Sequence, residues 1–152
     1  MKDNLHKFFK GFRYAAQGIA YAVKTQINFR FHLTAAFWVL LLSQFYGFSK
    51  AEYGLLFLTI GSVLASELVN TAVEKAVDLS TDKEHPLAKA AKDTAAGAVL
   101  VSAAAAVCVG VKLFLNAAVF KEIAVFMAAQ PVFIAIAAVL AAVSLIFVFK
   151  GI

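Results

Sequence analysis

The sequence predicts an all-α fold, a polytopic helical bundle in a membrane. Of the 152 residues, 62% are hydrophobic and only 15% are charged, which is too apolar for a domain with a water-exposed surface. Three apolar runs, at about 31–48, 51–78 and 93–116, are long enough to cross a hydrocarbon core, which takes about 20 helical residues. A fourth run, at about 127–149, is nearly free of polar groups. We therefore expect four transmembrane helices.

The first 28 residues predict an amphipathic surface helix. Aromatic side chains such as Phe8 and Phe12 are interleaved with basic ones such as Lys10 and Arg13, and no compact apolar stretch marks a cleavable signal peptide. Basic and aromatic residues together suit a helix that lies in the membrane interface. The same pattern fits a cytoplasmic helix packed on the transmembrane helices, and the sequence leaves both open.

Short polar segments separate the apolar runs. Residues 46–50 predict a turn after the first run, with Ser49 as the N-cap of the next helix. Residues 79–89 are polar and include Pro86, which indicates a loop between the second and third runs. Pro131 fits the start of the last helix, because proline is favoured at the first helical position.

The distribution of lysine and arginine predicts the orientation in the membrane. Three of the 14 basic residues, Lys50, Lys112 and Lys121, fall on one side of the predicted topology, and the remaining eleven fall on the other. These eleven are Lys2, Lys7, Lys10, Arg13, Lys24, Arg30, Lys75, Lys83, Lys89, Lys92 and Lys150. Basic residues favour the cytoplasmic side of a membrane. We therefore expect a multi-pass protein of the cell membrane with both termini and the polar loop in the cytoplasm. Anionic lipids explain the net charge of +5 better than nucleic acid does.

A polar stripe interrupts the second apolar run. Glu67, Asn70, Glu74 and Asp78 follow one another at spacings of three, four and four, which places them on one helical face. Acids inside an apolar helix are costly, so the stripe should face protein, water or a cation rather than lipid. The 28-residue run would be about 42 Å long, so Asp78 should reach the cytoplasmic interface, with Glu67 about 16 Å deeper.

Lys92 and Asp93 should open the third transmembrane helix at the same cytoplasmic level. A lysine can neutralise phosphate oxygens, and paired carboxylates with an amide suit Mg²⁺ and a polyphosphate. The sequence has no glycine-rich phosphate loop and no protein-kinase catalytic-loop motif. His6, His32 and His85 are scattered, and we interpret each as an interfacial residue rather than a ligand.

Two other interpretations of the stripe remain open from the residues alone. The polar side chains could only hold helices together in a structural membrane protein. They could also line an ion or proton path in a small conducting protein, which would consume no ATP.

Two motifs resemble the small integral-membrane lipid kinases of bacteria, the prokaryotic diacylglycerol kinase and undecaprenol kinase family. They are ELVNTAVEKAVD at 67–78 and HPLAKAAKDTAAGAV at 85–99, and the likeness extends over roughly residues 5–116. The form DLSTDKEHP at 78–86 looks most like the Gram-positive branch, where undecaprenol is often the acceptor.

The resemblance implies a kinase domain at 1–118, with an amphipathic surface helix and three core transmembrane helices, that forms a homotrimer with shared active sites. Residues 119–152 would be an extension with an extra fourth transmembrane helix. The implied activity is ATP- and Mg²⁺-dependent phosphorylation of a lipid alcohol, undecaprenol or alternatively diacylglycerol.

The resemblance also implies roles for the stripe and its neighbours. Glu67 would be the base that activates the lipid hydroxyl, and Glu74 would hold Mg²⁺. The ATP phosphates would be arranged by Asn70, Lys92 and Asp93.

Four further positions complete the implied site. Asp78 would support the nucleotide from the interface, and Lys10 and Tyr14 lie where the family contacts nucleotide. Gln26 stands where the family usually has a metal-binding glutamate. Its neutral amide can offer a carbonyl oxygen to Mg²⁺ but lacks the charge attraction of a carboxylate.

Overall fold

The chain folds into helices throughout its described part. The computed structural model describes residues 2–81 and 85–151, and every regular element in these ranges is an α-helix. The helices are α1 (Lys2–Thr25), α2 (Ile27–Ser43), α3 (Lys50–Ser80), α4 (Pro86–Phe114), α5 (Ala117–Ala129) and α6 (Pro131–Lys150). The predicted all-α fold class is therefore confirmed.

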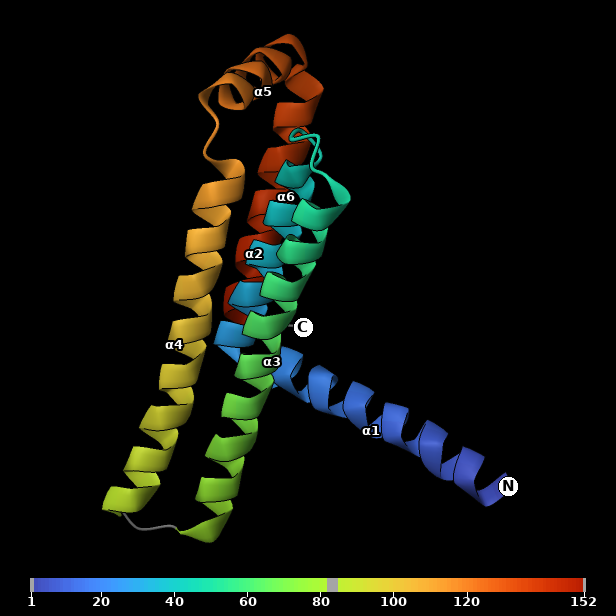
Figure 1. Ribbon diagram of the computed structural model, residues 1–152, viewed down its shortest axis with the longest axis vertical. Helices are drawn as coiled ribbons and strands as arrows, with labels where there is room; N and C mark the ends of the chain where they lie inside the picture. Colours follow the sequence, from blue (N-terminus) through green and yellow to red (C-terminus); the bar gives the residue numbers. More distant parts are fainter. Residues whose placement is uncertain (1, 82–84, 152) are drawn as a thin grey trace.

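The long antiparallel pair α3 and α4 forms the axis of the molecule (Figure 1). Helix α2 contacts α3 on one side and α6 on the other. Both α2 and α6 lie along the upper part of the pair, whereas the lower ends of α3 and α4 extend beyond them (Figure 1). The polar loop predicted at 79–89 reduces to a short connection there, and its residues 82–84 lie outside the described residues.

Three of the described helices are long and apolar enough to cross a membrane: α3, α4 and α6, with 31, 29 and 20 residues. The first predicted span, at 31–48, is shorter and earlier than expected, because α2 covers only Ile27–Ser43. At 17 residues it is roughly 25 Å long, the lower limit for a membrane-spanning helix. The chain turns after Ser43, with Gly47 at a φ of +32°, which glycine adopts at little cost.

The amino-terminal helix ends three residues before the predicted boundary at 28. Gln26 has an extended backbone, with φ −109° and ψ 110°, and separates α1 from α2. From this junction α1 leaves the bundle at a steep angle (Figure 1), and its side chains from Leu5 to Tyr21 are all exposed. Because α1 does not lie along the transmembrane helices of its own chain, the structure favours the interfacial interpretation.

The predicted cap at Ser49 is confirmed. The Ser49 hydroxyl accepts a hydrogen bond from the Glu52 backbone N–H, and the Glu52 carboxylate accepts one from the Ser49 backbone N–H at 2.8 Å. Nearby, the buried Tyr46 hydroxyl donates to the Phe114 carbonyl at 2.7 Å and so joins the turn to the end of α4. Burial raises the pKa of the Tyr46 phenol, which keeps it a hydrogen-bond donor.

Helix α4 begins seven residues before the predicted start at 93. The His85 ring nitrogen Nδ1 accepts from the Leu87 backbone N–H at 3.2 Å, and Pro86 occupies the first turn, where it leaves no hydrogen bond unmade. Lys92 and Asp93 therefore lie in the second turn of α4 rather than at its opening.

The carboxyl-terminal extension holds a helix that the sequence analysis did not predict. Asn116 follows the end of α4 and is the N-cap of α5. Its side-chain Oδ1 accepts a hydrogen bond from the Ala118 backbone N–H at 3.0 Å. Helix α5 crosses the end of the bundle (Figure 1), and α6 then begins at Pro131 rather than at 127. It returns along α2, where the Trp38 indole donates to the Ser144 hydroxyl at 3.1 Å.

Arg30 joins three helices at the other end of α2. Its guanidinium is buried and donates to the Val148 carbonyl of α6 at 2.9 Å. It also donates to the carbonyls of Val23 and Lys24 in α1, at 3.1 and 3.3 Å. These carbonyls belong to the last turns of α1 and α6, where the helix dipole favours a cation. The carboxyl ends of α1 and α6 consequently meet at the start of α2.

Candidate active site

The deepest residue of the polar stripe faces α2. Glu67 is only 2% exposed, and its Oε1 lies 3.3 Å from Nε2 of His32. A carboxylate this far from water requires a polar partner, because burying an unpaired charge costs several kcal/mol. His32 therefore belongs to the candidate site, contrary to its interpretation as an interfacial residue.

One turn further along α3, Asn70 and Glu74 contact each other. The Asn70 amide nitrogen donates to Glu74 Oε1 at 2.9 Å, while Asn70 Oδ1 is buried and meets no donor in the described part of the chain. Rotating the amide would turn its oxygen toward the carboxylate, so the observed orientation is the favourable one. A buried acceptor without a partner costs about 1–3 kcal/mol, which an incoming donor or cation would recover.

The end of the stripe faces α4. Lys92 Nζ lies 2.5 Å from Asp78 Oδ1, and Lys75 Nζ lies 3.5 Å from Asp78 Oδ2. The side chains of Lys92 and Asp78 are 41% and 46% exposed, so water screens their attraction. Such a pair contributes little stability, and a polyphosphate could compete for the lysine.

Asp93 points to a different partner from that of its neighbour. It forms an ion pair with Lys89, one turn earlier on α4, and both side chains are exposed. Lys92 thus contacts the stripe through Asp78, whereas Asp93 forms its ion pair with Lys89 of its own helix.

The predicted residues of α1 lie apart from the stripe. Lys10 and Tyr14 are exposed, and the Arg13 guanidinium lies 5.6 Å from the centroid of the Tyr14 ring. Gln26, at the junction with α2, donates to the Thr25 hydroxyl at 3.3 Å. No group of three His, Cys, Asp or Glu side chains suited to a metal converges within 2–81 and 85–151.

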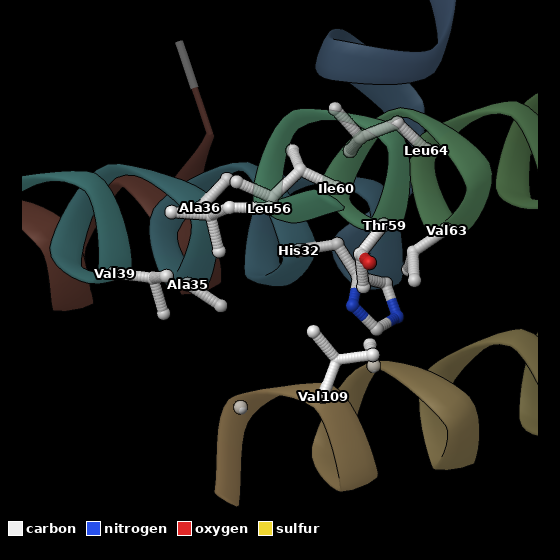
Figure 2. Close-up of a pocket in the computed structure, with 12 residues that line it drawn as sticks. His32, Ala35, Ala36, Val39, Leu56, Thr59, Ile60, Val63, Leu64 and Val109 are labelled. Atoms are coloured by element: carbon white, nitrogen blue, oxygen red, sulfur yellow. The ribbon is translucent and has the colours of Figure 1, made fainter. Parts of the chain in front are cut away.

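A small apolar cavity adjoins His32 between α2, α3 and α4. It encloses about 120 Å³. Figure 2 shows the His32 ring pointing into this space, with Val63 of α3 and Val109 of α4 beside it. The candidate site therefore combines a buried carboxylate with a neighbouring apolar surface.

Sequence reasoning missed two residues of this region, His32 and Arg30. The sequence places Arg30 only among the basic residues that predict the orientation, and His32 only among three scattered histidines. His32 lies within the run predicted at 31–48, and Arg30 directly precedes that run. A polar side chain in an apolar run is the signal that identified Glu67, and it applies to His32 as well.

Comparisons with known proteins cover most of the chain. The family model described as Prokaryotic diacylglycerol kinase matches residues 13–114. The undecaprenol kinase of Bacillus subtilis is 47% identical over 114 residues, which are 75% of this chain and 93% of that protein. The diacylglycerol kinase of Synechocystis is 46% identical over 100 residues, 65% of this chain and 57% of that protein. No solved structure gives a significant match.

Proposed function

Because the chain belongs to the prokaryotic diacylglycerol kinase family, we propose that it transfers the γ-phosphoryl group of ATP to undecaprenol. It is a lipid kinase, a phosphotransferase whose acceptor is an alcohol. The observation that carries the choice of undecaprenol is the 47% identity to the Bacillus subtilis enzyme over 93% of its length. Diacylglycerol is the second candidate, since the Synechocystis relative that bears its name is 46% identical.

The neighbourhood of Glu67 supports a lipid acceptor. The apolar cavity beside His32 offers a surface for a hydrocarbon chain close to the one deeply buried carboxylate of the stripe. An acceptor hydroxyl at the polar end of that surface would lie near Glu67, with its chain directed toward the middle of the bilayer. A membrane position is consistent with the three long apolar helices.

In the proposed reaction, Glu67 acts as the general base. The lipid hydroxyl oxygen attacks the γ-phosphorus of ATP, and a new oxygen–phosphorus bond forms while the bond to ADP breaks. Glu67 accepts the hydroxyl proton during this step and later releases it to solvent. Lys92, freed from Asp78, would neutralise phosphate oxygens, and Asn70 would help to orient them.

The residues around Glu74 fit Mg²⁺. Magnesium prefers oxygen ligands and is usually held by one or two carboxylates together with substrate phosphates. Glu74 supplies a carboxylate, and the unpartnered Oδ1 of Asn70 lies in the same cluster. When bound, the ion would neutralise negative charge on the phosphate groups. Gln26 would add a neutral oxygen from the α1–α2 junction.

The exposure of the amino-terminal part of α1 supports a homotrimer with shared sites. Lys10 and Tyr14 lie on a helix that leaves its own bundle (Figure 1), so a neighbouring chain is better placed to receive them. We place the shared sites, both termini and the polar loop on the cytoplasmic side of the cell membrane, because eleven of the 14 basic residues fall there.

A side-by-side assay tests the function. The full chain in mixed micelles is given radiolabelled ATP with undecaprenol or diacylglycerol, in Mg²⁺ and in a chelator. We expect faster labelling of undecaprenol and loss of activity in the chelator. Faster labelling of diacylglycerol would select the second candidate, and ion flux without lipid phosphorylation would contradict the kinase proposal.

A further inference from the structure

His32 contacts the proposed base from a different helix. Its Nε2 lies 3.3 Å from Glu67 Oε1, and the two side chains are 20% and 3% exposed. Thr71 also binds Glu67, but its hydroxyl donates to the backbone carbonyl and leaves the carboxylate free. In the described part of the chain, His32 is thus the polar side chain that can fix where the Glu67 carboxylate points.

We propose that His32 is a positioning residue for Glu67, an inference that rests on the proposed role of Glu67 as the base. A base works efficiently only when its reactive oxygen is held in place, commonly by a third group. Nε2 engages Oε1 and leaves Oε2 available for the acceptor hydroxyl. The distance of 3.3 Å is long for a hydrogen bond, and such contacts often tighten when substrate binds.

The position of His32 in the fold suits this role. Arg30, two residues earlier, fixes the start of α2 through three backbone carbonyls, so the helix that carries His32 is anchored. The His32 ring also lines the apolar cavity (Figure 2). His32 therefore lies between the carboxylate and the surface along which an apolar acceptor would approach.

The competing explanation is that His32 only holds α2 against α3. The chain offers a matched example of such a contact, because the hydroxyls of Ser66 and Ser102 lie 2.8 Å apart across α3 and α4. Replacing Ser102 removes a polar interhelical contact one residue from Glu67 without touching its carboxylate. A purely structural His32 should behave like Ser102.

The test compares the full-length variants His32→Leu, His32→Gln and Ser102→Ala. For each variant, kcat and the KM for ATP are measured in the lipid phosphorylation assay. We expect His32→Leu to lower kcat by about 10–100-fold with little change in KM, since only orientation of the base is lost. Glutamine places an amide N–H near the position of Nε2, so His32→Gln should recover most of the rate. Ser102→Ala should leave both constants close to those of the parent chain.

Two results would overturn the inference: a kcat for His32→Leu close to that of the parent, or a glutamine variant as slow as the leucine one. If His32→Leu does not fold, His32→Asn replaces it, because its amide is too short to reach Glu67. Equal rates for His32→Asn and His32→Gln would then reject positioning. A Glu67→Ala variant in the same assay tests the role of Glu67 separately from the role of His32. Near-normal turnover by Glu67→Ala would show that Glu67 is not the base.

Discussion

Glu67 is the residue on which the proposed chemistry depends most directly. We predict that Glu67→Ala lowers kcat by about 10²–10⁴-fold, the usual contribution of a general base. The matched control is Glu52→Gln, which neutralises an exposed carboxylate at the other end of α3 and keeps the capping contact possible. Lipid phosphorylation by the two purified variants is the measurement, and near-normal turnover by Glu67→Ala would remove it from the role of base.

Gln26 stands where the family resemblance implies a metal-binding glutamate. We predict that Gln26→Glu lowers the Mg²⁺ concentration for half-maximal activity on the order of tenfold, since a unit charge near a cation contributes about 1–4 kcal/mol at 4 Å. Gln44→Glu makes the same change in the turn at the other end of α2 and should leave the magnesium titration unchanged. An identical titration for Gln26→Glu and the parent would count against a metal role at this position.

The candidate site was largely predictable from the sequence at the level of single residues, and its pairings were not. The spacing of three and four places Glu67, Asn70 and Glu74 on one face for any helix, so the stripe needed no tertiary information. The contact of His32 with Glu67 depends on how α2 packs on α3, and local spacing does not record this.

Helix boundaries show the same limit. The apolar runs predict that the long helices exist, but the starts of α4 and α5 depend on N-caps made by single side chains. His85 and Asn116 each accept a backbone N–H and start a helix, His85 within the segment predicted as a polar loop and Asn116 at the end of the third apolar run. Signals of this kind are visible only when the capping residue is recognised as such.

Arg30 determines how the α6 element is attached. We predict that Arg30→Met lowers the free energy of unfolding by at least about 2 kcal/mol, because it leaves three helix-end carbonyls without a charged donor. Trp38 is the only tryptophan and donates to Ser144 of α6, so its fluorescence reports whether α6 stays in place.

The control for this prediction is Arg13→Met, which removes an arginine from the exposed face of α1. Thermal unfolding in micelles, followed by tryptophan emission, should shift for Arg30→Met and not for Arg13→Met. Equal transitions for the two variants would show that the carbonyl contacts of Arg30 contribute nothing to the attachment of α6.

In the molecule as a whole, the residues of the proposed site lie on two separate parts of the chain. The stripe lies on α3 and faces α2 and α4, whereas Lys10 and Tyr14 lie on α1, which points away (Figure 1). The α3 and α4 pair also extends beyond α2 and α6, so its polar end is open to a neighbouring chain. Shared sites in an oligomer would bring the two parts together.

Mixing two inactive chains tests whether sites are shared. One chain carries Glu67→Ala and keeps an intact α1, while the other carries Lys10→Ala with Tyr14→Ala and keeps an intact stripe. If each site takes α1 from one chain and α3 from another, randomly mixed oligomers should regain about a quarter of the parental sites, because half of each component is intact. Each variant assembled alone supplies the baseline. Activity that never exceeds this baseline after co-expression would mean that each site is built within a single chain, and α1 would then have to fold back onto its own α3.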